Sequence, residues 1–296
     1  MYSLQELQQL LRIYVTHDLF QAIVIETTAL CNRRCSFCPN SLLGREKGVM
    51  KIEDFKHIIN QLSSLHYKGR ISLHMYGEPL IDKRIIRFVG MVRRACPDAF
   101  IQLNTNGDFL TKKIVTAFGK AQVNLLYVSQ YDGKINQNVK EILQWIEEKK
   151  PKYRHMISVR VTTAFTDNRG GLLPHLGKRP IQKTPCYRTS TTMTINWHGD
   201  VVLCCSDYFG AVTFGNIRKQ SLRNIWLSPK FQQVRKNLFF GKRKTLPICS
   251  KCSYIPHTVY ADSTIEEHFH RNGLFTQLFV DPTISWTYAN TFISPN

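Results

Sequence analysis

Nine cysteines stand out in this chain of 296 residues, because most of them fall into two groups. The first group, Cys31, Cys35 and Cys38, has the spacing C-x3-C-x2-C on what we expect to be a short loop. Three thiolates so spaced can hold three irons of a cubane iron–sulfur cluster. The fourth iron then stays open to another ligand, and the missing fourth protein ligand argues against a structural zinc site.

The second group lies towards the C-terminus. Its members are Cys186, Cys204, Cys249 and Cys252. A C-x2-C pair is found both in iron–sulfur sites and in zinc sites. These four thiols could therefore hold an iron–sulfur cluster closed to substrate or a structural zinc ion. Cys205 stands beside Cys204, so the sequence leaves open which of these two thiols is the metal ligand.

Polar motifs follow several of the predicted strands. They are Tyr76-Gly77-Glu78-Pro79, Thr105-Asn106-Gly107 and Ser129-Gln130. The carboxyl ends of parallel strands meet at one edge of a sheet, where the active sites of such folds lie. We therefore expect these motifs and the first cysteine group to share one site.

Hydrophobic periodicity alternates between strand and helix over the first half of the chain. Strands are predicted at 22–26, 71–75, 100–104, 125–130 and 155–163. Helices are predicted at 52–65, 83–95, 112–119 and 138–149. This alternation indicates βαβ units and a parallel sheet, and five such strands favour an incomplete α/β barrel over one with eight strands.

The C-terminal half follows a different plan. A Gly-, Pro- and Lys/Arg-rich stretch at 168–182 is typical of a linker, and a β-hairpin is predicted over 191–205. A helix is predicted over 222–238, with an interruption near Pro229. We therefore expect four parts: an N-terminal helix at 1–20, a barrel at 21–180, a small hairpin and helix domain at 181–255, and a tail at 256–296.

The chain carries a strong positive charge, with 40 basic and 21 acidic residues. No Asp or Glu occurs between Asp207 and Asp262. This excess fits an anionic small-molecule substrate, an acidic electron donor, nucleic acid, or simply a solvated basic face. We find no secretory signal and no apolar run of bilayer length, so we expect a cytoplasmic protein without membrane contact.

The cysteine spacing, with the aromatic Phe37 before the last thiol, resembles the radical S-adenosylmethionine (SAM) superfamily. The resemblance implies a partial (β/α)6 barrel and a [4Fe–4S] cluster whose open iron binds SAM. In that superfamily an electron from the cluster cleaves SAM, and the 5′-deoxyadenosyl radical so formed takes a hydrogen atom from the substrate. An acidic flavodoxin or ferredoxin-type protein would supply the electron.

Further residues match superfamily motifs position by position. Tyr76-Gly77-Glu78-Pro79 resembles a Gly-Gly-Glu-Pro motif that contacts the SAM amino group, with Tyr in place of the first Gly. The resemblance implies that Glu78 receives the ammonium and that Asn106 lies near the ribose. Ser129 and Gln130 occupy positions where polar SAM ligands often lie.

The second cysteine group is similar to the Twitch extension, a short SPASM domain with one auxiliary [4Fe–4S] cluster. A full SPASM domain needs further cysteines after Cys252, and none follows. The resemblance therefore implies two clusters in the whole chain, with the auxiliary one acting as an electron relay.

Strings spread over residues 20–253 resemble the radical SAM dehydrogenases of aminoglycoside antibiotic biosynthesis, among them Asn168-Arg169-Gly170-Gly171. The resemblance implies oxidation of a secondary alcohol on a sugar or cyclitol, with the auxiliary cluster taking the second electron. Arg169 would be a catalytic residue of the substrate pocket, or else an ordinary loop arginine. Asn104 departs from the aromatic residue of those enzymes, which leaves the substrate open.

Three other functions compete with this one. A radical SAM epimerase would use a thiol such as Cys205 or Cys96 as hydrogen donor, and would give no net oxidation. A peptide-modifying maturase usually has a peptide-docking domain, for which the first 20 residues are too short. A zinc or nucleic-acid-binding protein would explain the C-x2-C pair, but the cysteines lack zinc-finger spacing and aromatic residues do not interleave the basic ones.

Overall fold

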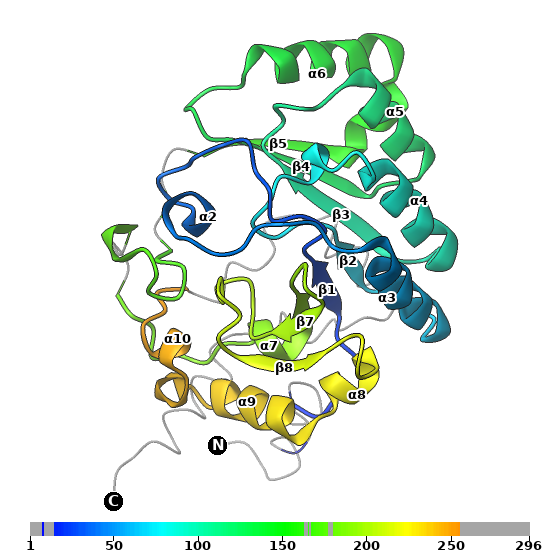
Figure 1. The fold of residues 1–296 in the computed structure, drawn as a ribbon. Coiled ribbons are helices and arrows are strands. Elements are labelled where there is room, and N and C mark those ends of the chain that lie inside the picture. Colours follow the sequence, from blue (N-terminus) through cyan, green and yellow to red (C-terminus); the bar gives the residue numbers. More distant parts are fainter. Residues whose placement is uncertain (1–7, 9–14, 163–164, 166, 177–179, 255–296) are drawn as a thin grey trace, which may run out of the picture. The chain divides into compact units, whose positions relative to one another are not determined.

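The computed structural model describes residues 8, 15–162, 165, 167–176 and 180–254 (Figure 1). The expected N-terminal helix and the tail at 256–296 lie almost entirely outside these residues. The chain forms two compact units: a barrel unit, Ile23–Phe165 with Ile195–Gly199, and a C-terminal unit, which holds the remaining residues. The domain limits expected from the sequence, at residues 20, 180 and 255, stay predictions.

The barrel unit is built on five strands in the order β5-β4-β3-β2-β1, with β2 to β5 paired in parallel. The strands are β1 (Ala22–Ile25), β2 (Arg70–Ser72), β3 (Phe100–Thr105), β4 (Leu125–Gln130) and β5 (Ile157–Val161). The connecting helices are α3 (Ile52–Ser64), α4 (Ile85–Ala95), α5 (Lys112–Lys120) and α6 (Gln137–Lys149), which lie along one side of the sheet (Figure 1). The α/β alternation expected from the sequence is confirmed.

The helices of the barrel unit bury the apolar stripe that predicted them. In α3 the buried apolar side chains are Phe55, Ile58, Ile59 and Leu62, which recur at helical spacing. The ring of Phe55 stacks on that of Phe88 in α4, with 4.1 Å between centroids. Both rings are fully buried, and each such side chain contributes about 1.5–3 kcal/mol through the hydrophobic effect.

The predicted hairpin forms over β6 (Thr192–Ile195) and β7 (Asp200–Val202), and one further strand, β8 (Thr213–Asn216), is not indicated by the sequence. These three strands are neighbours in that order, and β7 and β8 are antiparallel. The helix expected over 222–238 forms as α8 (Leu222–Trp226) and α9 (Pro229–Phe239). The break occurs because Ser228 caps α9 and Pro229 occupies its first turn, where no N–H is needed.

The core of the C-terminal unit surrounds Trp226, which is fully buried. Its indole N–H donates to the carbonyl of His17 at 3.0 Å, and the rings of Phe20 and Phe231 meet it edge-on. Arg235 is also fully buried, with its guanidinium carbon 4.2 Å from the Trp226 centroid. One arginine of the acid-free basic stretch is therefore a core residue and not part of a solvated face.

The stretch at 168–182, expected to be a linker, begins as a packed loop. The side chain of Asn168 donates to the carbonyl of Lys251 at 2.7 Å and accepts from the backbone N–H of Ser253 at 3.0 Å. Gly170 has a φ of 68°, and a Cβ there would lie 2.7 Å from a neighbouring side chain. The loop is thus fixed to the segment that ends the second cysteine group.

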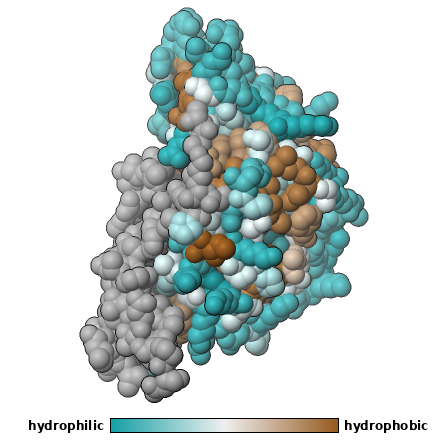
Figure 2. Space-filling model, turned by 90° about the vertical axis from the view of Figure 1, so that its left-hand side faces the viewer, coloured by the Kyte–Doolittle hydropathy of each residue, from teal (hydrophilic) through white to brown (hydrophobic). Residues whose placement is uncertain are grey.

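Figure 2 shows hydrophobic residues among hydrophilic ones on the surface in view. The large apolar side chains that are exposed in the described residues include Leu30, Leu42, Val49, Phe109, Val161, Ile181 and Phe209. Within the described part of the chain, no helix has both the length and the apolar character needed to cross a bilayer.

Candidate functional site

The first cysteine group lies on the loop that follows β1. Cys31 is exposed, whereas Cys35 and Cys38 are half-buried. The backbone N–H of Cys38 donates to the carbonyl of Cys35 at 3.2 Å, so the chain turns between these two thiols. Helix α2 (Pro39–Leu42) begins directly after Cys38 and ends the loop.

A buried asparagine anchors the end of this loop. The amide of Asn40 donates to the carbonyls of Ala29, at 3.0 Å, and Tyr76, at 3.3 Å. The ammonium of Lys47 donates to the Asn40 carbonyl at 2.6 Å. The cysteine loop is therefore tied both to the end of β1 and to the segment that follows β2.

Gly77 is required by a close approach of two backbone segments. A Cβ at this position would lie 2.1 Å from the carbonyl oxygen of Thr28, which no real Cβ can do. The next residue, Glu78, donates its backbone N–H to the carbonyl of Leu30 at 2.8 Å. The glycine thus lets the segment after β2 lie against the strand end that carries Cys31.

The carboxylate of Glu78 is buried and accepts three hydrogen bonds from the chain itself. One oxygen accepts from the hydroxyl of Thr105 at 2.7 Å and from the N–H of Leu80 at 3.0 Å, and the other accepts from the N–H of Asn106 at 2.8 Å. Burial raises the pKa of Glu78, although these donors oppose the shift. Glu78 therefore holds the loop after β3, and its contact with a SAM ammonium stays a prediction.

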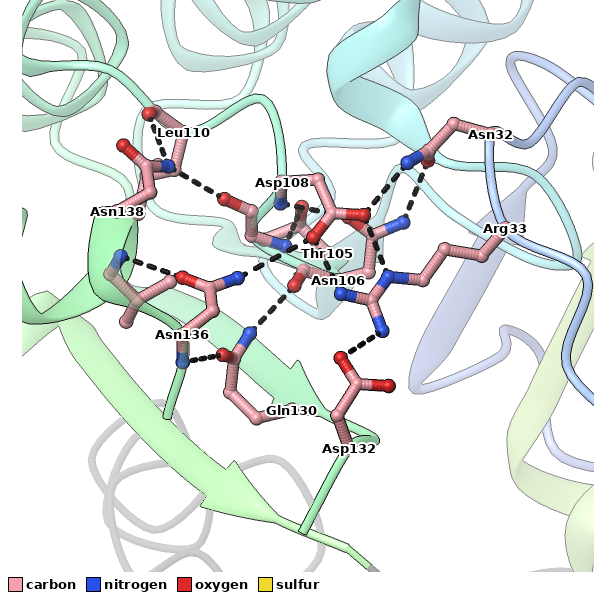
Figure 3. Close-up of polar contacts among 12 residues, drawn as sticks. Asn32, Arg33, Thr105, Asn106, Asp108, Leu110, Gln130, Asp132, Asn136 and Asn138 are labelled. Carbon is pink, nitrogen blue, oxygen red and sulfur yellow. Dashed lines mark hydrogen bonds and ion pairs between the residues drawn. The ribbon is translucent and has the colours of Figure 1, made fainter. Parts of the chain in front are cut away.

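Asn106 joins the loop after β3 to the first cysteine group (Figure 3). Its amide N–H donates to the side-chain oxygen of Asn32 at 2.9 Å, and its side-chain oxygen accepts from the N–H of Asp108 at 2.9 Å. Asn32 also donates to the Asp108 carboxylate at 2.7 Å. The predicted ribose contact of Asn106 is not tested by these bonds, but they place it beside the cysteine loop.

Arg33, inside the C-x3-C segment, is held by two carboxylates (Figure 3). Its Nε and Nη2 donate to the two oxygens of Asp108, both at 2.6 Å, and Nη1 donates to Asp132 at 2.9 Å. The bidentate pair lowers the pKa of Asp108 and raises that of Arg33. We call Arg33, Asp108 and Asp132 the loop clamp, because it ties the cysteine loop to the loops after β3 and β4.

Gln130, expected as a SAM ligand, uses both ends of its amide within the protein. Its N–H donates to the carbonyl of Asn106 at 2.7 Å, and its oxygen accepts from the N–H of Asn136 at 2.7 Å (Figure 3). Ser129 is buried in β4 opposite Arg160 of β5. In this structure Gln130 supports the loop that carries Asn106.

Phe37 belongs to an aromatic group. Its ring stacks on that of Phe165 with 3.5 Å between centroids and 13° between planes. The ring of Tyr131, which follows β4, lies 5.0 Å from Phe37. Flat faces of this kind suit a planar ring such as a purine base.

Without bound metal, the cysteines of the first group favour the protonated thiol over the thiolate. Burial raises the pKa of Cys31 and that of Cys35, the latter to about 11, and the charge of neighbouring Cys38 adds to both shifts. Among the described residues no three His, Cys, Asp or Glu side chains are grouped to hold a single metal ion. Each thiolate of a cubane site binds a different iron, and bound metal keeps it deprotonated, so the donor set fits a cluster.

The thiols of the second cysteine group lie within electrostatic range of one another in the C-terminal unit. Burial and the charges of Cys186 and Cys252 raise the pKa of Cys249 to about 12. Burial, together with the charges of Cys205 and Cys249, raises the pKa of Cys204 well above its usual range. Thiols 186, 204, 249 and 252, far apart in the sequence, are thus close enough to influence one another, which fits a four-thiolate cluster.

Arg169 lies on the packed loop of the C-terminal unit, with a φ of 52°. Its backbone N–H donates to the carboxylate of Asp167 at 2.7 Å, an arrangement that supports this left-handed conformation. Among the described residues, its side-chain Nε is buried and meets no acceptor. A buried donor without a partner is costly unless a ligand satisfies it.

Sequence reasoning missed the loop clamp and the aromatic partners of Phe37. A signal for the clamp was present, since Arg33 stands inside a cysteine motif and Asp108 follows Thr105-Asn106-Gly107 at a strand end. Opposite charges on loops at one sheet edge are candidates for an ion pair. The aromatic partners Tyr131 and Phe165 carry no such signal.

Two family descriptions match the chain. "Radical SAM superfamily" matches residues 25–159, and "Iron-sulfur cluster-binding domain" (SPASM) matches residues 186–253. A curated relative, the S-adenosyl-L-methionine-dependent 2-deoxy-scyllo-inosamine dehydrogenase of Niallia circulans, is 33% identical over 240 residues. The alignment covers 80% of this chain and 94% of that enzyme.

The chain belongs to the radical SAM superfamily. The crystal structure of BtrN in complex with AdoMet and 2-DOIA is similar to it with a TM-score of 0.73 and 32% identity, over 80% of this chain and 94% of BtrN. The structure of anSMEcpe with bound AdoMet shares the fold, with a TM-score of 0.54 and 12% identity over 92% of this chain and 99% of the other. A tungsten-containing aldehyde ferredoxin oxidoreductase cofactor-modifying protein of Pyrococcus furiosus is 23% identical, over 78% of this chain and 86% of that protein.

This radical SAM enzyme therefore uses SAM and two [4Fe–4S] clusters, one for each matched domain. The expected superfamily, fold, cofactors and enzymatic nature are confirmed. The individual ligand residues stay predictions.

Proposed function

We propose that this enzyme oxidises a secondary alcohol of a sugar or cyclitol-like small molecule to a ketone. The observation that carries the proposal is the similarity to the 2-deoxy-scyllo-inosamine dehydrogenase, which runs through both domains at 33% identity. An oxidation needs a place for the second electron, and a four-thiolate cluster, closed to substrate, suits that role.

The cluster ligands follow from the cysteine groups. We assign the SAM-binding cluster to Cys31, Cys35 and Cys38, and the auxiliary cluster to Cys186, Cys204, Cys249 and Cys252. We assign SAM contacts to Phe37, Tyr76, Gly77, Glu78, Pro79, Asn106, Ser129 and Gln130. When bound, SAM and the first cluster supply the radical that takes a hydrogen atom from the carbinol carbon, and the auxiliary cluster takes the remaining electron.

The chain's own residues prepare the site for this chemistry. The loop clamp and Asn40 hold the first cysteine loop, and the stack of Phe37 on Phe165 presents aromatic faces to an adenine ring. Arg169 offers its buried Nε as a donor to a substrate oxygen. That contact would orient the hydroxyl and favour the loss of its proton as the ketone forms.

The charge of the chain supports an acidic flavodoxin or ferredoxin-type donor for the first electron. The net charge is +19, and the stretch between Asp207 and Asp262 has no acidic residue. Two of its arginines, Arg235 and Arg243, are buried, so the other basic residues of the stretch would form the docking surface. The same charge would favour a substrate that carries a phosphate or carboxylate, whereas the similarity favours an aminocyclitol.

The test is an anaerobic assay on the reconstituted enzyme with SAM and a reductant. Aminocyclitols, and sugars with and without a phosphate, are supplied as substrates, and products are identified by mass spectrometry. We expect a product two hydrogens lighter, formed with one 5′-deoxyadenosine. A product of unchanged mass with an inverted centre would make the enzyme an epimerase, and a colourless zinc protein that does not cleave SAM would contradict the proposal.

A further inference from the structure

A buried arginine lies beside the second cysteine group. Arg188 begins α7 (Arg188–Thr191), two residues after Cys186. Its Nη1 donates to the sulfur of Cys205 at 3.1 Å and to the hydroxyl of Ser206 at 3.3 Å. Its guanidinium carbon lies 3.5 Å from the centroid of the Tyr254 ring. These contacts fix the guanidinium in one place.

Two of the thiols near Arg188, Cys186 and Cys204, are assigned to the auxiliary cluster, and the third, Cys205, stands next to Cys204 in the chain. The charges of Cys186, Cys204 and Cys205 all act on its guanidinium. An arginine stays protonated in any protein environment, so it brings a permanent positive charge to this buried place. A second buried arginine, Arg243, acts on Cys249 and Cys252. It also donates to the carbonyls of Thr184, Pro185 and Tyr254, so it has a structural role in holding the backbone.

The contacts also separate the two adjacent cysteines. Cys204 interacts electrostatically with Cys249, a member of the expected ligand set. The sulfur of Cys205 instead accepts the hydrogen bond from Arg188. We therefore assign iron binding to Cys204, as expected from the sequence, because Cys205 is the thiol whose sulfur accepts the hydrogen bond of the arginine.

A charge at this place has a direct electrostatic consequence. A [4Fe–4S] cluster with four thiolates is an anion, and reduction adds one more negative charge. A fixed positive charge nearby, in a buried environment, stabilises the reduced form more than the oxidised form. The reduction potential of the cluster therefore rises, which makes it a better electron acceptor.

We propose that Arg188, held by Cys205 and Tyr254, raises the reduction potential of the auxiliary cluster so that this cluster accepts the electron of the substrate radical. In this step the radical loses one electron and its hydroxyl proton to become the ketone, and the auxiliary cluster gains the electron. The inference rests on the proposed dehydrogenation. Arg188 is a positioning residue, since it acts through the cluster.

The test measures the auxiliary cluster by itself. Cys31, Cys35 and Cys38 are all changed to Ala, and the remaining cluster is titrated electrochemically while its reduced form is followed by electron paramagnetic resonance. In this background, Arg188→Gln should lower the ratio of reduced to oxidised cluster at a fixed potential on the order of tenfold, which is about 59 mV for one electron. Arg188→Lys keeps the charge and should stay within about threefold of the parent.

Two controls make the result specific. Arg218→Gln removes an exposed arginine of the same unit and should leave the potential unchanged. Cys205→Ala should keep about four irons in the auxiliary site, whereas Cys204→Ala should not. An unchanged potential in Arg188→Gln, an equal shift in Arg188→Lys, a Gln variant that assembles no cluster, or loss of iron from Cys205→Ala would each overturn the proposal.

Turnover separates this inference from the proposed function. In the otherwise natural chain, Arg188→Gln should cleave SAM as before but form less ketone for each 5′-deoxyadenosine. If the unmodified enzyme forms no ketone while the potential shifts as expected, the dehydrogenation fails and the electrostatic role of Arg188 stands. If ketone forms and the potential does not shift, only the role of Arg188 fails.

Discussion

At the scale of single residues, the two cysteine groups divide the chemistry between starting a radical and removing an electron. Three thiols leave an iron open, and four thiols close a cluster. The side chains around them do different work in each unit. In the barrel unit carboxylates clamp an arginine of the cysteine loop, and in the C-terminal unit an arginine lies among the thiols themselves.

Replacing one cysteine of each group should separate these two roles. Cys31→Ala should abolish SAM cleavage, because the first cluster loses a ligand. Cys249→Ala should keep part of the cleavage activity yet form no ketone, because the auxiliary electron acceptor is lost. The measurement is the amount of 5′-deoxyadenosine and of ketone formed in the same reaction. If both variants lose both products to the same extent, the two cysteine groups do not have separate roles.

The loop clamp should control how firmly the first cluster is held. Asp108→Asn removes the charge that Arg33 contacts twice, at a site that is only partly exposed. We expect a loss of about 1 kcal/mol, or roughly fivefold faster removal of iron by a chelator. Asp98→Asn, which breaks an exposed pair with Lys68, is the control and should not change the rate. Equal rates of iron removal in Asp108→Asn and Asp98→Asn would contradict a role of the loop clamp in holding the cluster.

At the scale of elements, short contacts between strand ends set the position of the site. Gly77 permits the backbone approach between the segments after β1 and β2, and Glu78 joins the latter to the loop after β3. His74 adds a further link, since its Nδ1 accepts the backbone N–H of Asn104 at 3.2 Å. Asn104, where the chain departs from the aromatic residue of the resembled dehydrogenases, thus links its backbone to the segment after β2.

His74 should make the barrel unit sensitive to acid. Burial lowers its pKa from 6.5 to about 3, so the unfolded chain binds a proton that the folded chain does not. Its contribution to stability is complete above pH 6.5 and decreases as pH falls from 6.5 towards 3, by up to about 1.4 kcal/mol per pH unit. His74→Asn keeps an acceptor near Nδ1 but does not titrate. Urea unfolding at pH 7 and pH 5 should show a smaller decrease for this variant than for the natural chain.

At the scale of the whole molecule, charge is the property with the clearest functional consequence. The net charge of +19 should attract an acidic protein donor and speed its encounter with the enzyme. Because salt screens such attraction, reduction by an acidic flavodoxin should slow as ionic strength rises from 0.05 to about 0.5 M. Reduction by a small cationic dye serves as the control and should not slow. If the rate of reduction by the flavodoxin does not change with ionic strength, electrostatic docking is excluded.

Much of the architecture could be predicted from the sequence because it depends on local patterns. The apolar stripe of α3, the β1 to β5 alternation and the proline at the start of α9 all act over a few residues. The sequence does not indicate strand β8, because its short segment carries Gly and Asn and, within the described part of the chain, pairs with β7 alone. The sequence predicts a linker for the packed loop around Asn168, because the residues that this loop contacts lie more than 80 positions away in the chain.

The sequence by itself determined the two cysteine groups and the superfamily, since ligand type and spacing are local properties. Only the tertiary structure decided what holds these groups in place. The pairing of Arg33 with Asp108 spans 75 residues, and that of Arg188 with Cys205 spans 17. Such contacts depend on which loops the strands bring to one edge and which side chains the core forces together. No local pattern encodes them, because they result from packing over the whole unit.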